Sequence, residues 1–305
     1  MTPELLEKLK DSAEMFVFLA VELTVLFLAI SYLVGILQEY IPPEKIKSIL
    51  SSKNGKGYII SALLGAITPF CSCSTIPFLK GLLRAQAGFG PMMVFLFASP
   101  LLNPIVIALF IATFGLKVAL IYFSMALGVS VSAGYTLEKL GYEKYIKPFE
   151  SEQIRGSCCA TSKPKNKWLR IWDTVWSDFK TALPYLLIAV FIGAIIHGFV
   201  PTEFITEYAS DDNLLAIPFA AVVGIPLYIR AITLVPLSAA LVAKGMGVGA
   251  VMAFIIGSAG ASLPEVILLK SMFKNELILA FLLVVIGMAI STGLLFSFLF
   301  TTGFL

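Results

Sequence analysis

The sequence contains few charged residues. Asp, Glu, Lys and Arg together make up 13% of the 305 residues, whereas 58% are hydrophobic. A soluble domain carries about 25% charged residues and needs polar side chains to cover its surface. The shortage excludes a water-soluble enzyme, and the 24 Phe residues exclude a disordered chain. The composition therefore predicts a multi-pass integral membrane protein.

Residues used in metal and nucleotide chemistry are also scarce. The chain has one His and four Cys, and it lacks a Walker motif and a nucleophile elbow. His197 lies near the end of an apolar run, which favours a packed role over a proton relay. Cys158 and Cys159 are adjacent in a polar segment, where they either capture a soft metal or metalloid or are incidental. We expect no enzyme, no ATP-driven pump, no cofactor and no nucleic-acid partner, which leaves secondary transport.

The charged residues divide the chain into three parts. Residues 138–180 hold nine Lys/Arg and six Asp/Glu, whereas long uncharged runs lie on either side. We therefore predict a first transmembrane repeat over 1–137, a cytoplasmic hydrophilic linker over 138–180, and a second transmembrane repeat over 181–305. Trp168, Trp172 and Trp176 recur every four residues, which predicts an interfacial helix at the end of the linker.

The two halves resemble each other at an offset of 159 residues. The matches include Pro77 with Pro236, Gly65 with Gly224, and Ser99 with Ser258. The loop over 38–56 carries four Lys and two Glu, whereas the equivalent 201–212 carries four acids and no base. Because basic loops favour the cytoplasm, the two equivalent loops are expected on opposite sides, Lys53 inside and Asp211 outside. The fold class predicted is an all-α membrane protein with two inverted repeats.

Inverted repeats require an odd number of crossings in each half. Each half shows four hydrophobic segments, so one segment in each is expected not to cross. Residues 57–84 and 213–244 have Pro-, Gly- and Ser-containing breaks near their centres, which suits re-entrant helical hairpins. The prediction is therefore three spanning helices plus one hairpin per half. The alternative is eight spans and a parallel repeat.

Four Pro- or Gly-containing breaks interrupt the apolar runs. They cover residues 68–77, 99–104, 224–230 and 258–265. Irregular backbone inside a bilayer occurs where it is covered by protein or lines a water-filled cavity. If the halves pack about a pseudo-twofold axis, the four breaks meet near the midplane, where transporter sites form.

Two cysteines and two charged residues stand at these breaks. Cys71 and Cys73 form a Cys-X-Cys pair that suits transient binding of a soft metal or metalloid, because two ligands are too few for a structural zinc site. Arg230 and Glu265 are isolated within apolar runs, so they form either a structural ion pair or an anion-binding Arg beside a proton-coupling carboxylate. The neutral candidates for substrate binding, each of which could also be a cap or a packing residue, are Ser99, Asn103, Tyr228, Ser258 and Ser262.

Three of these segments resemble the motifs of a predicted permease family that includes bacterial organoarsenical efflux permeases. The segments are Pro-Phe-Cys-Ser-Cys-Ser-Thr-Ile-Pro at 69–77, Ser-Pro-Leu-Leu-Asn-Pro at 99–104, and Ser-Ala-Gly-Ala-Ser-Leu-Pro-Glu at 258–265. The resemblance covers nearly the whole chain and implies an eight-segment permease of the inner membrane. Some relatives have a cysteine where this chain has Arg230, so a purely thiolate-bound substrate is less expected than an anionic or mixed one.

The resulting prediction is a secondary permease in the cytoplasmic membrane that exports or moves a small organoarsenical or metalloid-like solute. A soft-metal-ion or sulfur-anion permease is the first alternative. A membrane redox or metal-sensing protein, in which Cys71 and Cys73 cycle to a disulfide, is the second, and a structural subunit of a larger complex is the third. The expected partners are the lipid bilayer and a small molecule or ion, and the oligomeric state is left open.

Overall fold

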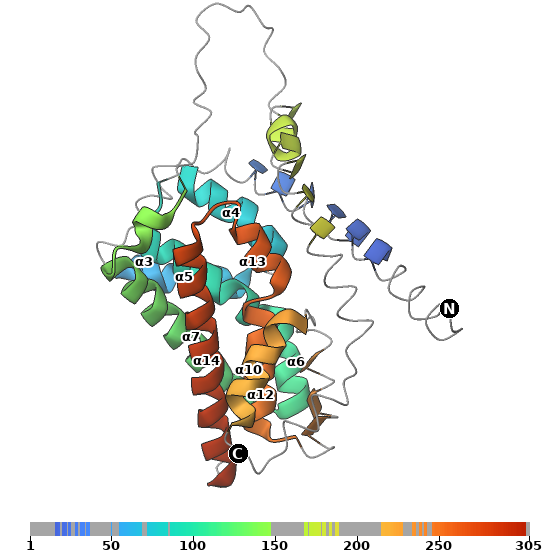
Figure 1. The fold of residues 1–305 in the computed structure, drawn as a ribbon, viewed down its shortest axis with the longest axis vertical. Helices are drawn as coiled ribbons and strands as arrows, with labels where there is room; N and C mark the ends of the chain where they lie inside the picture. The colour runs from blue at the N-terminus through green and yellow to red at the C-terminus, as the bar shows by residue number, and fades with distance from the viewer. Residues whose placement is uncertain are drawn as a thin grey trace, which may run out of the picture.

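The computed structural model describes residues 50, 55–68, 72–84, 86–147, 215–227 and 246–302, together with parts of 16–36, 168–188 and 234–242. The described part is almost entirely helical (Figure 1). Its labelled elements are α3 (Lys56–Ile67), α4 (Ser72–Arg84), α5 (Phe89–Leu101), α6 (Pro104–Phe114), α7 (Leu116–Lys139), the 3-10 turn η2 (Tyr142–Tyr145), α10 (Ala216–Leu227), α12 (Val248–Gly260), α13 (Leu263–Leu269) and α14 (Asn275–Thr301).

Helices α5 and α12 form the centre of the bundle. Every residue of α5 is buried, and so is nearly all of α12. Both are apolar around their whole circumference, which is typical of a helix enclosed on all sides. Helices α7 and α14 lie further out and expose large apolar side chains such as Leu120, Leu283 and Phe298. Exposed apolar surface of this kind suits contact with lipid rather than water.

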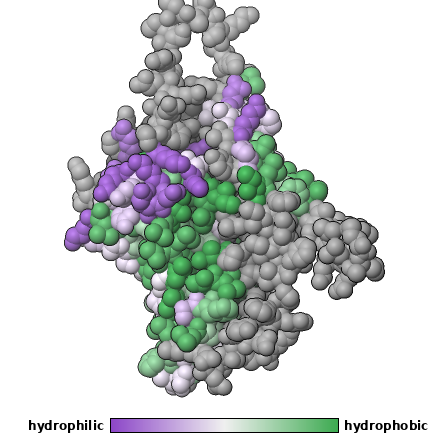
Figure 2. All heavy atoms as spheres, in the orientation of Figure 1, coloured by the Kyte–Doolittle hydropathy of each residue, from purple (hydrophilic) through white to green (hydrophobic). Residues whose placement is uncertain are grey.

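Several described helices are long and apolar enough to cross a membrane. Three meet this criterion, namely α7, the stretch Val248–Leu269 and α14. A fourth is possible if α5 and α6, which bend by 43° at the break between them, form one span. The described part of the chain is therefore compatible with a multi-pass membrane protein. Figure 2 agrees, because hydrophobic side chains cover the body of the visible face and hydrophilic ones gather towards one end.

The repeat appears in the packing of the described helices. Helix α3 packs on α5 and α5 on α7, and α10 packs on α12 and α12 on α14 in the same order. A Cβ placed on Gly65 would lie 3.1 Å from the Ser99 backbone nitrogen, and one on Gly224 would lie 3.0 Å from that of Ser258. These contacts are equivalent at the offset of 159 residues. Matched glycines therefore let the same pairs of helices approach closely in both halves.

A second pair of close approaches follows the same offset. A Cβ on Gly134 would lie 2.8 Å from the Gly90 carbonyl oxygen, and one on Gly293 would lie 2.7 Å from that of Gly249. Gly134 and Gly293 differ by 159 positions, as do Gly90 and Gly249. The structure thus extends the repeat to α7 and α14, which begin at the equivalent residues 116 and 275.

The end of α7 lies beside the start of α14. The Lys274 amide donates to the Tyr145 carbonyl at 2.9 Å, and the Lys147 amide donates to the Met272 carbonyl at 3.0 Å. These bonds connect the segment that follows α7 with the turn that precedes α14. Helix α7 ends at this end of the molecule, whereas its equivalent, α14, begins there. One helix therefore runs towards this end and the other runs away from it.

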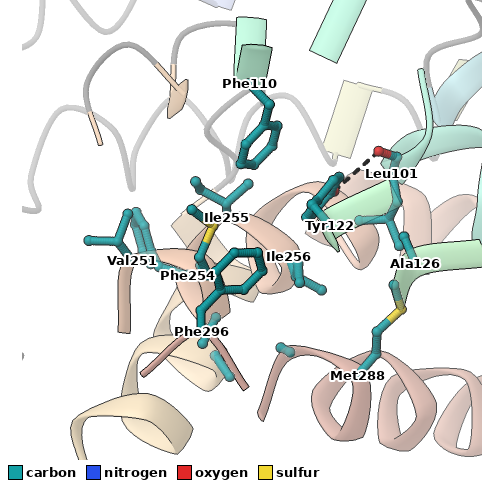
Figure 3. Packing of buried hydrophobic residues seen from close by; sticks show 14 of the residues in the cluster. Leu101, Phe110, Tyr122, Ala126, Val251, Phe254, Ile255, Ile256, Met288 and Phe296 are labelled. Atoms are coloured by element: carbon teal, nitrogen blue, oxygen red, sulfur yellow. Dashed lines mark hydrogen bonds between the residues drawn. The ribbon is translucent and has the colours of Figure 1, made fainter. Parts of the chain in front are cut away.

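The two halves share their apolar core. Phe97 of α5 stacks on Phe281 of α14, with ring centroids 5.3 Å apart. Tyr122 of α7 donates a hydrogen bond to the Leu101 carbonyl at 3.1 Å and belongs to the same buried cluster as Ile256 of α12 (Figure 3). The two central helices α5 and α12 also contact each other, as do the outer helices α7 and α14.

The helix breaks are shorter than the sequence predicted. We expected irregular backbone over 68–77, but α4 begins at Ser72, so that Cys73 and Pro77 are helical. Likewise α10 continues through Gly224 and Pro226 to Leu227. The prediction was wrong at Gly224 because this glycine provides room for α12 rather than a turn. The breaks within 99–104 and 258–265 reduce to 102–103 and 261–262.

The tryptophan segment is helical wherever residues 168–180 are described. The three indoles are 41–52% exposed, and Trp172 stacks on Trp176 with centroids 6.3 Å apart. Tyr32, from the first apolar run, lies 6.4 Å from Trp168 and 5.9 Å from Trp172. This segment therefore packs on the first apolar run, and its interfacial role remains a prediction.

Candidate functional site

The first half contributes a buried hydroxyl pair. Thr75 and Ser99 are both fully buried, and their hydroxyl oxygens lie 3.4 Å apart. Thr75 lies in the first turns of α4, and Ser99 lies near the end of α5. Pro77 lacks an amide hydrogen, so the helical hydrogen bond to the Cys73 carbonyl is missing next to this pair. The Cys-X-Cys segment is therefore followed at once by a polar contact between α4 and α5.

The second half places a carboxylate inside the bundle. Glu265 lies in the first turn of α13 and is only 1% exposed. Ser262 precedes this helix and is also buried, and its hydroxyl has no hydrogen-bond partner among the described residues. An unsatisfied buried hydroxyl is costly, so a partner from a solute or water would stabilise it. These residues form the most polar buried segment of the described second half.

Two other predicted site residues have local partners. The Asn103 side-chain oxygen accepts a hydrogen bond from the Ile105 amide at 3.0 Å, which caps the start of α6. Ser258 is buried and donates to the Ile255 carbonyl at 3.1 Å within α12. Asn103 and Ser262 occupy equivalent positions, each before a helix that follows a central helix. The sequence allowed Asn103 to be either a helix cap or a substrate-binding residue, and in the structure it caps α6.

A charged residue that the sequence analysis passed over also lies inside the bundle. Lys80 of α4 is 8% exposed, between the buried residues Leu79 and Leu82. Helix α4 packs against α5 and α13. The sequence did carry a signal, because Lys80 interrupts an otherwise apolar run from 75 to 83. A lysine near the edge of an apolar segment, however, usually indicates the membrane boundary and does not predict a side chain buried inside the helical bundle.

A second unpredicted cluster ties the ends of three helices together. The Glu138 carboxylate accepts a hydrogen bond from the Tyr58 hydroxyl at 2.5 Å and another from the Gly90 amide at 2.9 Å. These residues belong to α7, α3 and α5. The equivalent positions in the second half are Ser297, Ile217 and Gly249, which carry no charge. The cluster therefore stabilises the first half only.

Several predicted site residues lie outside the described residues. These are Cys71, Tyr228 and Arg230, together with His197, Cys158 and Cys159. Cys73 is placed only by the helical backbone of α4. Within the described part of the chain, no group of three or more His, Cys, Asp or Glu residues could hold a metal ion.

A bundle of apolar helices with polar residues buried at its breaks is compatible with an integral membrane protein and is typical of transporters. The chain belongs to the predicted permease family ArsP_1, whose profile matches residues 8–298. The family is one of permeases rather than of enzymes, which confirms the prediction that the chain is not an enzyme. The resemblance drawn from the three motifs is likewise confirmed.

Three relatives illustrate this similarity. A UPF0718 protein of Methanocaldococcus jannaschii is 23% identical over 285 residues, covering 74% of this chain and 77% of the relative. The UPF0718 protein YcgR of Bacillus subtilis is 22% identical, covering 86% of this chain and 88% of the relative. A Streptococcus mutans protein, whose name proposes a subunit of a two-component membrane permease complex, is 22% identical, covering 87% and 88%. No solved structure matches the chain.

Proposed function

We propose that the chain is a secondary permease of the cytoplasmic membrane that moves a small soft or anionic solute, of the organoarsenical kind, through a site at its helix breaks. The observation that carries this proposal is the burial of Glu265, Ser99 and Ser262 next to helix ends in an otherwise apolar bundle. Polar residues are costly inside a membrane protein and mark solute pathways. Broken helices in equivalent positions of two halves are typical of transporter sites.

Each type of residue has a different role in the proposed site. Cys71 and Cys73 provide soft thiolate ligands, and Arg230 provides a positive charge for an anionic part of the solute. Glu265 provides the balancing charge and a group that can carry a proton. Ser99, Ser262 and Tyr228 provide neutral hydrogen bonds, whereas Asn103 and Ser258 are already engaged by the Ile105 amide and the Ile255 carbonyl. A soft metal ion or a sulfur anion would use subsets of the same groups, which makes these solutes the alternatives.

Uptake by proteoliposomes tests the assignment. The variant with Cys71→Ser and Cys73→Ser is expected to lose uptake of phenylarsine oxide, a trivalent organoarsenical, by about tenfold or more, because hydroxyls bind arsenic(III) far less well than thiolates. Arg230→Ala is expected to weaken uptake of an anion such as thiosulfate by a similar factor. A matched control, Cys158→Ser with Cys159→Ser, removes the thiols of the linker alone.

The two cysteine pairs give a direct comparison. The control is expected to match the wild type with each of three probes, phenylarsine oxide, thiosulfate and Zn²⁺, whichever of them the wild type transports. Undiminished transport of every probe by both site variants would remove Cys71, Cys73 and Arg230 from the mechanism. Cross-linking of Cys71 to Cys73 by a mild oxidant without any transport by the wild type would favour the redox alternative.

The proposed architecture is an inverted repeat with three spanning helices and a re-entrant hairpin in each half. It is supported by the opposite direction of α7 and α14 relative to the contact between Tyr145 and Lys274. The lengths of α3 and α4, 12 and 13 residues, suit the arms of a hairpin that reaches about 20 Å into the bilayer. Parallel repeats would direct equivalent helices alike.

Labelling of equivalent residues distinguishes the two topologies. Lys117 and Glu276 are exposed, occupy equivalent positions at the starts of α7 and α14, and differ by 159 positions. We expect Lys117→Cys and Glu276→Cys, each in a background without native cysteines, to react with a membrane-impermeant maleimide from opposite sides. Lys144→Cys, beside the start of α14, serves as a control that reacts from the same side as Glu276→Cys. Reaction of positions 117 and 276 from one side would establish parallel repeats.

A further inference from the structure

Exposed lysines gather at the end of the bundle where α7 ends and α14 begins. Hydrophilic side chains collect towards this end in Figure 2, away from the C-terminus that Figure 1 marks beyond the far end of α14. The described lysines exposed there are Lys56, Lys139, Lys144, Lys147, Lys270 and Lys274. The described acids beside them are Glu138, Glu143 and Glu276. This end of the described part of the chain therefore carries an excess of positive charge.

Three of these lysines meet at the seam between the two halves, and we call Lys147, Lys270 and Lys274 the lysine junction. The Lys147 ammonium donates to the Lys270 carbonyl at 2.5 Å. Ile146 and Phe273 form an antiparallel bridge beside it and pack in one apolar cluster. Residues next to such a bridge point to the opposite face, so the exposed Lys147 and Lys274 share the outer face. Diagonal neighbours of this kind are about 7–8 Å apart.

Two tyrosines lie beside the lysine junction. Tyr142 and Tyr145 of η2 are half-buried, with ring centroids 5.5 Å apart, and the Lys144 ammonium lies 5.1 Å from the centre of the Tyr145 ring. Tyrosine is enriched where a membrane meets water, because its ring is apolar and its hydroxyl is polar. Helix α7 ends and α14 begins at this level, and both are long and apolar enough to cross a membrane. The lysine junction thus suits the depth of lipid headgroups.

The equivalent positions at the opposite end of the repeat are uncharged. Lys270 and Lys274 correspond to Ile111 and Gly115 at the offset of 159 residues. Packing of the repeated helices therefore does not require a charge at either position. The preference of basic residues for the cytoplasmic side explains why one end has many lysines. It does not explain why lysines of both halves meet at one seam.

We propose that the lysine junction binds the phosphate of an anionic phospholipid headgroup, and that the bound lipid bridges the two halves. Basic residues at a membrane surface attract anionic lipids, and basic pockets between membrane helices bind their headgroups. An ammonium has three donors, so Lys147 can donate to a phosphate while it donates to the Lys270 carbonyl. Leu279 and Leu283 are exposed near the start of α14 and offer apolar surface to the acyl chains. The inference is independent of the solute that the permease moves.

Stabilisation of the full chain by lipid tests the inference. Dioleoylphosphatidylglycerol, which is anionic, or dioleoylphosphatidylcholine, which is zwitterionic, is added to the protein in dodecyl maltoside micelles at constant ionic strength. The affinity for each lipid is measured from the rise in unfolding temperature. Wild type is expected to bind the phosphatidylglycerol about tenfold or more tightly than the phosphatidylcholine. Equal affinity for the two lipids would overturn the inference.

Substitutions on the two sides of the seam test the bridge between the halves. Lys147→Gln and Lys274→Gln are each expected to weaken phosphatidylglycerol binding about fivefold, because each removes one positive charge from the site. The Gln amide in the Lys147 variant can still donate to the Lys270 carbonyl, which preserves the seam. Lys147→Arg and Lys274→Arg keep the charge and are expected to bind within about threefold of wild type. If only one of the two Gln variants weakens binding, the lipid does not bridge the halves.

A lysine at the other end of α7 provides the matched control. Lys117 is exposed there, and Lys117→Gln is expected to bind phosphatidylglycerol as the wild type does. A loss equal to that of Lys274→Gln would mean that net charge, rather than the lysine junction, attracts the lipid, and the inference would fail. Native mass spectrometry of the phosphatidylglycerol retained after purification provides a second readout for any variant that unfolds at a lower temperature.

A soluble headgroup distinguishes a lipid site from a general phosphate site. Glycerol 1-phosphate has the phosphate but no acyl chains, so it is expected to leave the unfolding temperature of the wild type unchanged at concentrations where phosphatidylglycerol saturates. A rise in that temperature that Lys274→Gln abolishes would mean that the lysine junction takes a soluble phosphate, which would contradict the assignment to lipid.

Discussion

The Gly134→Leu variant is expected to yield almost no folded protein. A Cβ at this position would lie 2.8 Å from the Gly90 carbonyl oxygen, and its nearest side-chain neighbour is Val94. Because the obstacle includes backbone of α5, relief requires the two helices to separate, which opens the packing of a fully buried helix. We estimate a loss of about 4 kcal/mol or more, a large part of the 5–15 kcal/mol that stabilises a typical domain. Size-exclusion chromatography of the detergent-solubilised protein measures the outcome.

The same helix supplies the control for this experiment. Gly128 also lies in α7, and a Cβ placed there meets no atom within 4 Å. Gly128→Leu adds the same side chain on the exposed face and is expected to purify like the wild type. The repeat offers a second matched pair, because Gly293 is crowded like Gly134 whereas Gly287 is open like Gly128. Similar yields of Gly134→Leu and Gly128→Leu would contradict the close approach of α5 and α7.

The Glu138→Ala variant is expected to lose about 2–3 kcal/mol of unfolding free energy. The carboxylate accepts hydrogen bonds from the Tyr58 hydroxyl and the Gly90 amide, and hydrogen bonds to a charged group contribute about 1.5–3 kcal/mol. Removal frees the ends of α3 and α5 from α7. Reversible unfolding in mixed micelles, followed by circular dichroism, gives the free energy. The control is Glu143→Ala, an exposed glutamate on η2.

A double-mutant cycle shows whether the lost stability belongs to this hydrogen bond. Tyr58→Phe removes the hydroxyl and keeps the ring, which packs edge-on against Tyr135 with centroids 6.0 Å apart. If Tyr58 and Glu138 act together, the double variant is expected to lose about 0.5–3 kcal/mol less than the sum of the single losses. Additive losses would mean that the two residues stabilise the fold independently.

The membrane class and the breaks at 102–103 and 261–262 followed from sequence patterns. A long uncharged run indicates a membrane segment, and Pro or Gly indicates where a helix can break. Both signals depend on neighbouring residues, so they can be recognised in the sequence. The extent of each break did not follow, because Gly224 permits both a turn and a close helix contact. Only the position of α12 decides between them, and Gly224 lies 34 residues before Ser258, the residue whose backbone it faces.

The missed polar residues share another cause. Glu138 and Tyr58 are 80 positions apart, and each alone looks like an ordinary residue at the end of a helix. Lys80 looks like the boundary of an apolar run until α13 is known to pack against α4. Ser99, Ser262 and Glu265 were predicted from their place at breaks, and the structure buries all three.

The contact between Leu101 and Gly260 joins two positions that are equivalent in the proposed repeat. These residues are equivalent at the offset of 159, and a Cβ on Gly260 would lie 3.5 Å from a methyl of Leu101. In an assembly of two identical halves, a residue on the symmetry axis packs against its own copy. Two leucines would crowd this point and two glycines would leave a void. This chain has Leu101 at one position and Gly260 at the other, so the leucine side chain fills the space left beside the glycine. If such an axis relates the two halves, the pairing of Leu101 with Gly260 is a complementary fit that two identical subunits could not make.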